Sequence, residues 1–228
     1  MSRKQILIAL GALVLIALAG ATYYVLAPEA PAATASGPAF VITPHDRTLG
    51  NPKAKVTLIE YAAPSCPVCA HFNADTFPLV KQNYIDTGKV FYVFRLFPLR
   101  PDDGAAEKIA RCLPEDKYFS FIDLLFRNQP KWDVEYAQEN PALASPDGVH
   151  AGLVLLGRIA GMSAEQVDKC MTDTKEDDII NKVAQDGDAR YSIQGTPTIV
   201  VDGVSEGSHF FSYDELKKIL DTALAGKK

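Results

Sequence analysis

The sequence predicts one α/β domain that carries a helical insertion and is preceded by an export segment. Strand-forming runs occur at residues 55–61 and 90–97, the strand signal returns at 198–201, and a helical stretch of about 102–191 separates them. With 228 residues, 47% of them hydrophobic, the chain can build one sizeable core. The net charge of −5, with both signs spread along the chain, argues against nucleic acid as a partner.

The N-terminal residues differ in character from the rest of the chain. Arg3 and Lys4 precede residues 6–26, which carry no charge. A basic start followed by an apolar run is typical of an export signal, and this run also reaches the length that spans a bilayer. We therefore expect residues 1–27 to be a signal peptide or a signal anchor, and both alternatives stay open. Residues 28–39 are rich in Ala and Pro and are expected to form a linker.

The remaining residues, 40–228, are expected to form the folded domain. Basic residues before the apolar run would stay inside the cell, so the domain would face the periplasm or the extracytoplasmic side. Disulfides persist in that compartment, and all four cysteines lie in this part of the chain.

The sequence of the first half of the domain predicts a strand, a helix and a second strand. Residues 55–61 and 90–97 are rich in β-branched and aromatic side chains, which favour strands. Residues 66–84 show a helical pattern, with Pro67 suited to the first turn. Pro78 is expected to kink or interrupt that helix because it lacks a backbone N–H.

The second half predicts several helices, then a hairpin and a final helix. The Asp202-Gly203 dipeptide is typical of a two-residue hairpin turn after the strand at 198–201. Ser212 and Glu215 are spaced as a capping box for the last helix, as Ser163 and Gln166 are for an earlier one. Within the insertion we expect helices at 105–112, 118–126, 149–160, 163–171 and 177–191.

The pair Cys66-Pro67-Val68-Cys69 carries the clearest chemical signal. At a helix N-terminus, unpaired N–H groups and the helix dipole stabilise a thiolate at Cys66. A thiolate attacks a disulfide, and a second thiol one turn later resolves the mixed disulfide. Two alternatives remain: a purely structural disulfide, and a metal site that also uses His71. Structural zinc takes four ligands, and no second cysteine or histidine cluster is present.

Thr196-Pro197 precedes the hairpin strand. If the peptide bond between them is cis, it would hold a tight loop whose backbone can pair with a bound peptide. An ordinary trans proline at the start of a strand is the alternative.

Residues 59–69 (IEYAAPSCPVC) followed far downstream by residues 195–198 (GTPT) resemble the DsbA-like thioredoxin family. The resemblance covers about residues 50–225, and the two motifs in this order are highly specific. It implies a thioredoxin fold with an inserted helical subdomain.

The resemblance also implies roles for individual residues. Cys66 would be the nucleophile and Cys69 the resolving thiol of a redox-active disulfide. Thr196 and Pro197 would form the cis-proline loop that binds substrate. Glu60 would be a buried acid that exchanges a proton with Cys69, whereas a surface residue on an edge strand is the alternative.

Cys112 and Cys170 lie near the ends of two expected helices. Similar positions carry a second disulfide in some members of the family, so the resemblance implies a structural Cys112–Cys170 bond. Two buried free thiols are the alternative, because cysteine often serves as a small core residue.

Val68 departs from the family pattern, because oxidising members typically carry histidine at this position. Valine supplies neither a positive charge nor a donor, so the Cys66 thiolate should be less stabilised and the disulfide a weaker oxidant. His71 lies beyond Cys69 and does not replace that histidine.

The function expected from these features is a thiol–disulfide oxidase that needs no cofactor and no metal. It would donate the Cys66–Cys69 disulfide to exported unfolded or reduced proteins and be recharged by a DsbB-like, quinone-linked membrane oxidase. The same-fold alternative is a reductase or isomerase kept reduced by a membrane electron donor. A metal-delivery protein and a peptide-binding chaperone with an inert disulfide are further alternatives.

Overall fold

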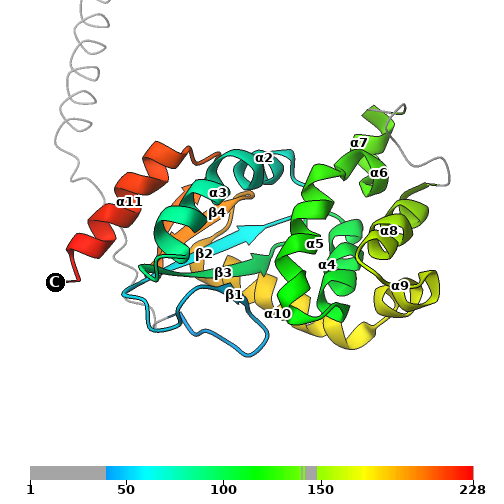
Figure 1. Ribbon diagram of the computed structural model, residues 1–228, viewed down its shortest axis with the longest axis horizontal. Helices are drawn as coiled ribbons and strands as arrows, with labels where there is room; N and C mark the ends of the chain where they lie inside the picture. Colours follow the sequence, from blue (N-terminus) through cyan, green and yellow to red (C-terminus); the bar gives the residue numbers. More distant parts are fainter. Residues whose placement is uncertain (1–39, 140, 142–147, 228) are drawn as a thin grey trace, which may run out of the picture. The chain divides into compact units, whose positions relative to one another are not determined.

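A five-stranded mixed sheet lies at the centre of the fold (Figure 1). The computed structural model describes residues 40–139, 141 and 148–227, so the expected export segment and linker lie outside the described residues. The strand order is β1-β3-β2-β4-β5. β2 and β3 run parallel, and the other neighbouring pairs are antiparallel. The strands are β1 (Arg47–Leu49), β2 (Val56–Ala62), β3 (Val90–Leu96), β4 (Thr198–Val201) and β5 (Val204–Ser208).

Alternation along β2 sends its side chains to two separate cores. Leu58 and Ala62 belong to the larger core, while Ile59 and Tyr61 belong to a smaller core on the opposite face. Because successive side chains point to opposite faces of a sheet, Glu60 shares the face of Leu58 and Ala62. The alternation of side chains along β2 therefore directs the Glu60 carboxyl group into the larger core.

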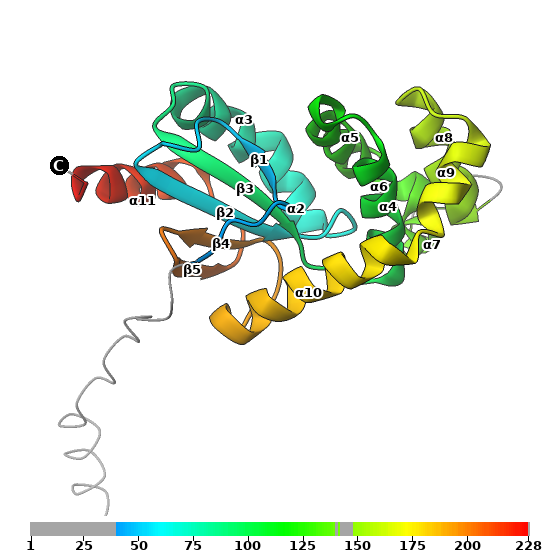
Figure 2. The same ribbon diagram turned by 90° about the horizontal axis from the view of Figure 1, so that it is seen from below.

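Helices cover both faces of the sheet (Figures 1 and 2). The final helix, α11 (Tyr213–Ala225), packs into the larger core through Leu216 and Leu220. The long helix α10 (Thr174–Tyr191) runs along the other face. A Cβ at Gly187 of α10 would lie only 2.5 Å from the Tyr61 ring, so glycine lets this helix approach the sheet closely.

One helical path leads away from the cysteine pair and includes two π-helical turns. Its segments are α2 (Pro67–His71), η1 (Phe72–Thr76), α3 (Phe77–Val80) and η2 (Lys81–Ile85). Phe77 donates its N–H to the Phe72 carbonyl, five residues earlier. Pro78 therefore interrupts the α-helical hydrogen-bond pattern locally, while the chain continues as a helix.

The helices between β3 and β4 occupy residues 101–191, close to the range expected for the insertion. The Ser163 capping box forms with both of its hydrogen bonds to Gln166, at 2.7 and 3.1 Å. Besides α10, the helices are α4 (Pro101–Cys112), α5 (Glu115–Arg127), α6 (Gln129–Trp132), α7 (Val134–Glu139), α8 (Gly148–Ile159) and α9 (Ala164–Met171). The sequence does not predict the two short helices α6 and α7.

The hairpin turn adopts the geometry that its sequence predicts. Asp202 and Gly203 both have positive φ, 49° and 85°, as a type I′ turn requires. Strand β1 was not predicted, because three half-buried residues carry no periodic signal. Within the described part of the chain no helix is both long and apolar enough to cross a bilayer, and the candidate span at 6–26 lies outside it.

Candidate active site

Cys66 is the N-cap of α2, directly after the loop that leaves strand β2. Its backbone is extended, and Pro67 takes the first helical position, where a missing N–H costs no hydrogen bond. The Cys66 N–H bonds the Ala63 carbonyl at 2.9 Å, which closes the turn. The Cys69 N–H donates to Cys66 Sγ at 3.3 Å. The thiol therefore occupies the position at which an N-cap side chain accepts a hydrogen bond from the helix.

This position lowers the pKa of the Cys66 thiol to about 6. The largest cause is a hydrogen bond from the Cys69 side chain, and the backbone N–H groups of Cys69 and Val68 add to it. Burial opposes these effects without cancelling them. Most Cys66 side chains are therefore thiolates at neutral pH when both cysteines are reduced, and the structure holds both as free thiols.

Cys69 behaves in the opposite way, because burial raises the pKa of its thiol well above the usual value. The negative charges of Cys66 and Glu60 raise it further. The two sulfurs of one short motif thus differ in ionisation: Cys66 is the readily ionised sulfur and the better leaving group, whereas Cys69 holds its proton.

Glu60 is buried below the cysteines on the central strand β2, in contrast to the surface alternative. Burial raises the pKa of its carboxyl to about 7, although a 2.6 Å hydrogen bond from the Tyr92 hydroxyl lowers it. The rings of Phe77 and Phe119 lie 4.8 and 5.9 Å from that of Tyr92, which keeps the hydroxyl in place.

The Thr196–Pro197 peptide bond is cis, and its loop faces Cys66. As a thiol, Cys66 donates from Sγ to the Thr196 carbonyl oxygen at 3.2 Å. The two motifs, 130 residues apart in sequence, therefore meet at one point.

Cys112 and Cys170 form a disulfide with 6.2 Å between their Cα atoms. It joins the end of α4 to the end of α9 within the helical insertion. The structure thus brings together Cys66, Cys69, Glu60, Thr196 and Pro197 but not the second cysteine pair.

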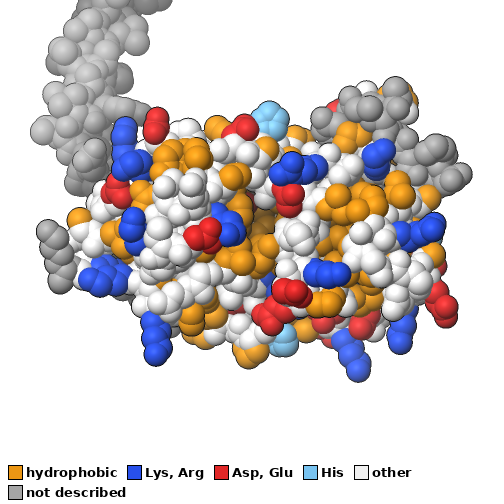
Figure 3. Space-filling view, viewed as in Figure 1, with side chains coloured by type: hydrophobic (Ala, Val, Ile, Leu, Met, Phe, Trp, Pro, Cys, Tyr) orange, Lys and Arg blue, Asp and Glu red, His pale blue; other side chains and the backbone are white. Residues whose placement is uncertain are grey.

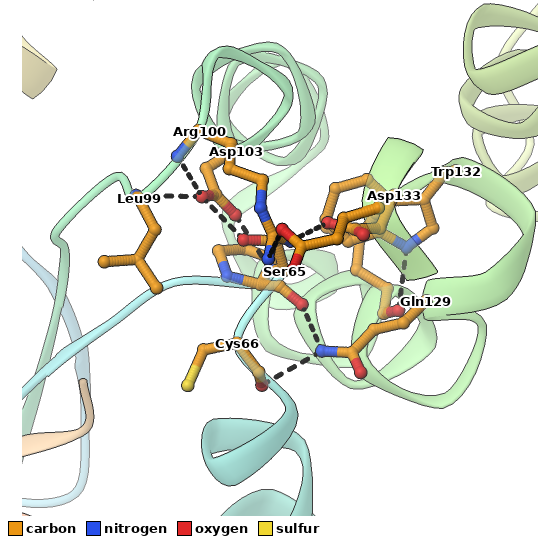
Figure 4. Close-up of polar contacts among 11 residues, drawn as sticks. Ser65, Cys66, Leu99, Arg100, Asp103, Gln129, Trp132 and Asp133 are labelled. Atoms are coloured by element: carbon orange, nitrogen blue, oxygen red, sulfur yellow. Dashed lines mark hydrogen bonds and ion pairs between the residues drawn. The ribbon is translucent and has the colours of Figure 1, made fainter. Parts of the chain in front are cut away.

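Three further residues of the site were missed by the sequence reasoning: Tyr92, Asp103 and Gln129. Asp103 accepts hydrogen bonds from the backbone N–H and the hydroxyl of Ser65, at 2.7 and 2.8 Å (Figure 4). Gln129 donates to the carbonyl oxygens of Pro64 and Cys66. These contacts span 32 to 65 residues of sequence, so no local motif could reveal them.

Among the described residues, no group of three or more His, Cys, Asp or Glu side chains is arranged to bind a metal ion. His71 is exposed on α2.

A dithiol at a helix N-terminus beside a cis-proline loop, on a sheet of this topology, defines the class of thioredoxin-fold proteins. A family model described as thioredoxin matches residues 42–222. A relative from Rickettsia bellii, named as a protein-disulfide oxidoreductase, is 30% identical over 83% of this chain and 68% of its own length. The Bacillus subtilis disulfide bond formation protein D is 28% identical over 78% of this chain and 77% of its own.

The crystal structure of Wolbachia pipientis alpha-DsbA1 is similar, with a TM-score of 0.70 and 27% identity over 82% of this chain and 95% of that one. The chain belongs to the thioredoxin family, and within it to the DsbA-type thiol–disulfide oxidoreductases.

Proposed function

We propose that the chain is a disulfide oxidase that transfers the Cys66–Cys69 disulfide to exported proteins. The observation that carries this direction is the lowered pKa of the Cys66 thiol, about 6. A thiolate that is stabilised in the reduced protein makes reduction of the disulfide more favourable, and the disulfide is then a stronger oxidant.

The reaction is two thiol–disulfide exchanges. A substrate thiolate attacks Cys66 Sγ, the Cys66–Cys69 bond breaks, and Cys69 leaves as a thiolate. A second substrate thiolate then attacks the substrate sulfur of the mixed disulfide and releases the Cys66 thiolate. Two electrons pass from the substrate dithiol to the two cysteines, and the substrate gains one disulfide.

Glu60 is proposed to supply the proton that the leaving Cys69 needs. A carboxyl with a pKa of about 7 is protonated in a large fraction of molecules at neutral pH. The raised pKa of Cys69 makes that thiolate a strong proton acceptor. Glu60 also raises the pKa of Cys69 by its charge, so the two groups are electrostatically coupled.

Thr196 and Pro197 are proposed to bind the substrate backbone beside the reacting sulfur.

Apolar side chains also gather in a hollow between the sheet half and the helical half of the face shown in Figure 3. Val68 and Leu99 are 39% and 47% exposed, and unfolded proteins present apolar segments that such side chains can contact.

We place this activity in the periplasm or on the extracytoplasmic face, because the charge-free run at 6–26 follows two basic residues. A membrane oxidase of the DsbB type would recharge the cysteines. The relative named disulfide bond formation protein D supports this direction.

A reductase or isomerase is the second candidate, and Val68 is the observation that favours it. Without histidine between the cysteines, the thiolate lacks one source of stabilisation. An isomerase is kept reduced and acts on proteins with wrongly paired disulfides.

Redox titration of the folded domain against glutathione, read by thiol trapping, tests the proposal. We expect a potential well above the range of structural disulfides, about −300 mV and lower. The domain should also oxidise a reduced unfolded protein stoichiometrically, and Cys66→Ser should abolish this. A strongly reducing potential with fast exchange would favour the reductase or isomerase instead, and repair of a scrambled substrate would distinguish the isomerase.

A further inference from the structure

The loop that carries Cys66 is held by side chains of the helical insertion. Gln129, the first residue of α6, donates from Nε2 to the Pro64 carbonyl at 2.7 Å and to the Cys66 carbonyl at 3.0 Å. Gln129 is only 3% exposed, and the residues of the loop are buried as well. Figure 4 shows the amide reaching across from its helix to both carbonyl oxygens.

Asp103 of α4 holds the same loop from another side. Its carboxylate accepts the Ser65 N–H and hydroxyl, and also the N–H groups of Leu99 and Arg100, both at 3.0 Å. Asp103 thus ties the loop to the start of α4 (Figure 4). Ser65 lies between the two carbonyls that Gln129 binds, so three consecutive residues, Pro64 to Cys66, are hydrogen-bonded to the insertion.

We propose, on the basis of the function proposed above, that Gln129 is a positioning residue through which the helical insertion sets the place and reactivity of the Cys66 sulfur. Gln129 does not touch the sulfur, because it acts on the backbone on both sides of Ser65. The insertion is therefore a working part of the redox site and not only a cover for it.

The first reason is geometric. Attack on a disulfide requires the three sulfur atoms to lie nearly in line, so a small displacement of Cys66 costs rate. The side chain of Cys66 projects from the residue whose carbonyl Gln129 binds. Two hydrogen bonds from one planar amide restrict rotation of the Pro64–Ser65 and Cys66–Pro67 peptide groups.

The second reason is electrostatic. The Cys66 carbonyl oxygen carries a negative partial charge within the same residue as the thiolate. It already accepts the Ala70 N–H at 3.0 Å as the first bond of α2, and Gln129 occupies its second acceptor position. Without the Gln129 amide this oxygen would repel the thiolate more strongly, which would raise the pKa of the Cys66 thiol.

The chemistry of the side chain fits this task. Both contacts need a donor, and the glutamine amide has two N–H groups on one nitrogen. A methionine of nearly the same volume would fill the space but donate nothing, and it would leave a buried carbonyl unpaired. Gln129→Met is therefore the variant that isolates the donor function.

Tyr118→Phe is the matched control. Tyr118 is equally buried in the insertion, and its hydroxyl donates to Glu107 rather than to the loop. This variant should lose a comparable buried hydrogen bond, and hence a comparable part of the stability, without reaching Cys66.

The test compares wild type, Gln129→Met and Tyr118→Phe as full domains in three measurements. These are the rate constant for mixed-disulfide formation with glutathione disulfide, the pKa of Cys66 from thiolate absorbance, and the free energy of unfolding. We expect the rate constant of Gln129→Met to be about tenfold lower, because losing about one hydrogen bond raises the activation free energy by an amount that corresponds to that factor. The pKa of Cys66 should rise in the same variant. Tyr118→Phe should change only the unfolding free energy.

The inference is overturned if Gln129→Met exchanges within about twofold of wild type with an unchanged Cys66 pKa. If wild type itself does not exchange, the proposed function fails and not the role of Gln129 alone. Should Gln129→Met not fold, Gln129→Leu removes the donor with a shorter apolar side chain. A normal rate in that folded variant would equally refute the proposal.

Discussion

The two cysteine pairs of this chain show how position decides the chemistry of the same residue. Cys66 and Cys69 are three residues apart at a helix N-terminus, whereas Cys112 and Cys170 are 58 residues apart and join two helix ends. Closing a 58-residue loop removes about 4 kcal/mol of chain entropy from the unfolded state, and closing the short loop about half of that. The long link is therefore suited to stability and the short one to exchange.

The difference extends to the surroundings of the sulfurs. Cys66 faces helix N–H groups, the Thr196 carbonyl and the buried carboxyl of Glu60. Cys112 and Cys170 belong to the last turns of α4 and α9, where helices end in carbonyl groups. A helix C-terminus does not stabilise a thiolate, so this second pair should remain oxidised and take no part in exchange.

The largest expected effect is the loss of exchange in Cys66→Ser. We expect the rate of disulfide transfer to fall by at least about a thousandfold, because the attacked sulfur is gone. Cys69→Ser should instead accumulate a mixed disulfide at Cys66, because no resolving thiol remains. Both are read by thiol trapping and gel shift. Exchange that survived in Cys66→Ser would assign the chemistry to the other pair.

The next effect is the stability loss in the double variant Cys112→Ala/Cys170→Ala. We expect the free energy of unfolding to fall by up to about 4 kcal/mol, because the unfolded chain regains the entropy of the loop. The rate of exchange at Cys66 should stay close to that of wild type. Denaturant unfolding and the glutathione titration measure the two quantities, and a large change in exchange would show that the second pair also tunes the site.

Glu60→Gln should remove a pH dependence of stability. The folded pKa of about 7 lies above the ordinary 4.5, so the folded state binds the proton more tightly and wild-type stability falls as pH rises between these values. The fall is about 3 kcal/mol for this one group. Glu60→Gln, which cannot ionise, should gain that amount over wild type above pH 7 and gain nothing below pH 4.5.

The same variant should slow exchange, because the proton for Cys69 would have to come from water. Tyr92→Phe provides the comparison: it removes the hydrogen bond that lowers the pKa of Glu60, so that pKa should rise further. The free energy of unfolding of both variants is measured against pH. If Glu60→Gln and Tyr92→Phe changed this pH dependence in the same way, its assignment to Glu60 would be contradicted.

The smallest expected effect is that of Val68→His. A histidine between the cysteines should lower the pKa of Cys66 below its present value of about 6. The equilibrium constant for reduction of the Cys66–Cys69 disulfide by glutathione should rise by about tenfold or less, which makes the protein a stronger oxidant. Val204→His, at an exposed valine on β5, is the matched control and should leave the equilibrium unchanged.

Local sequence signals predicted the redox motif and most of the regular elements. Pro67 after Cys66, the capping box at Ser163 and the Asp202-Gly203 turn each act over a few residues, and the structure confirms them as local features. The short elements β1, α6 and α7 escaped prediction because they are held by contacts with the rest of the fold rather than by their own periodicity.

Sequence by itself determined the α/β class with its helical insertion and the sulfur pair, since both follow from residue types at short spacing. The cis-proline loop at Pro197 was implied only by the resemblance to a known family. Tertiary structure alone decided how those sulfurs ionise. Burial of Glu60 depends on the register of β2 between β3 and β4. The hydrogen bonds of Gln129 and Asp103 with the Cys66 loop depend on where the helical insertion packs. Desolvation and hydrogen bonding between distant segments exist only once the chain has folded, and they set the pKa values on which exchange depends.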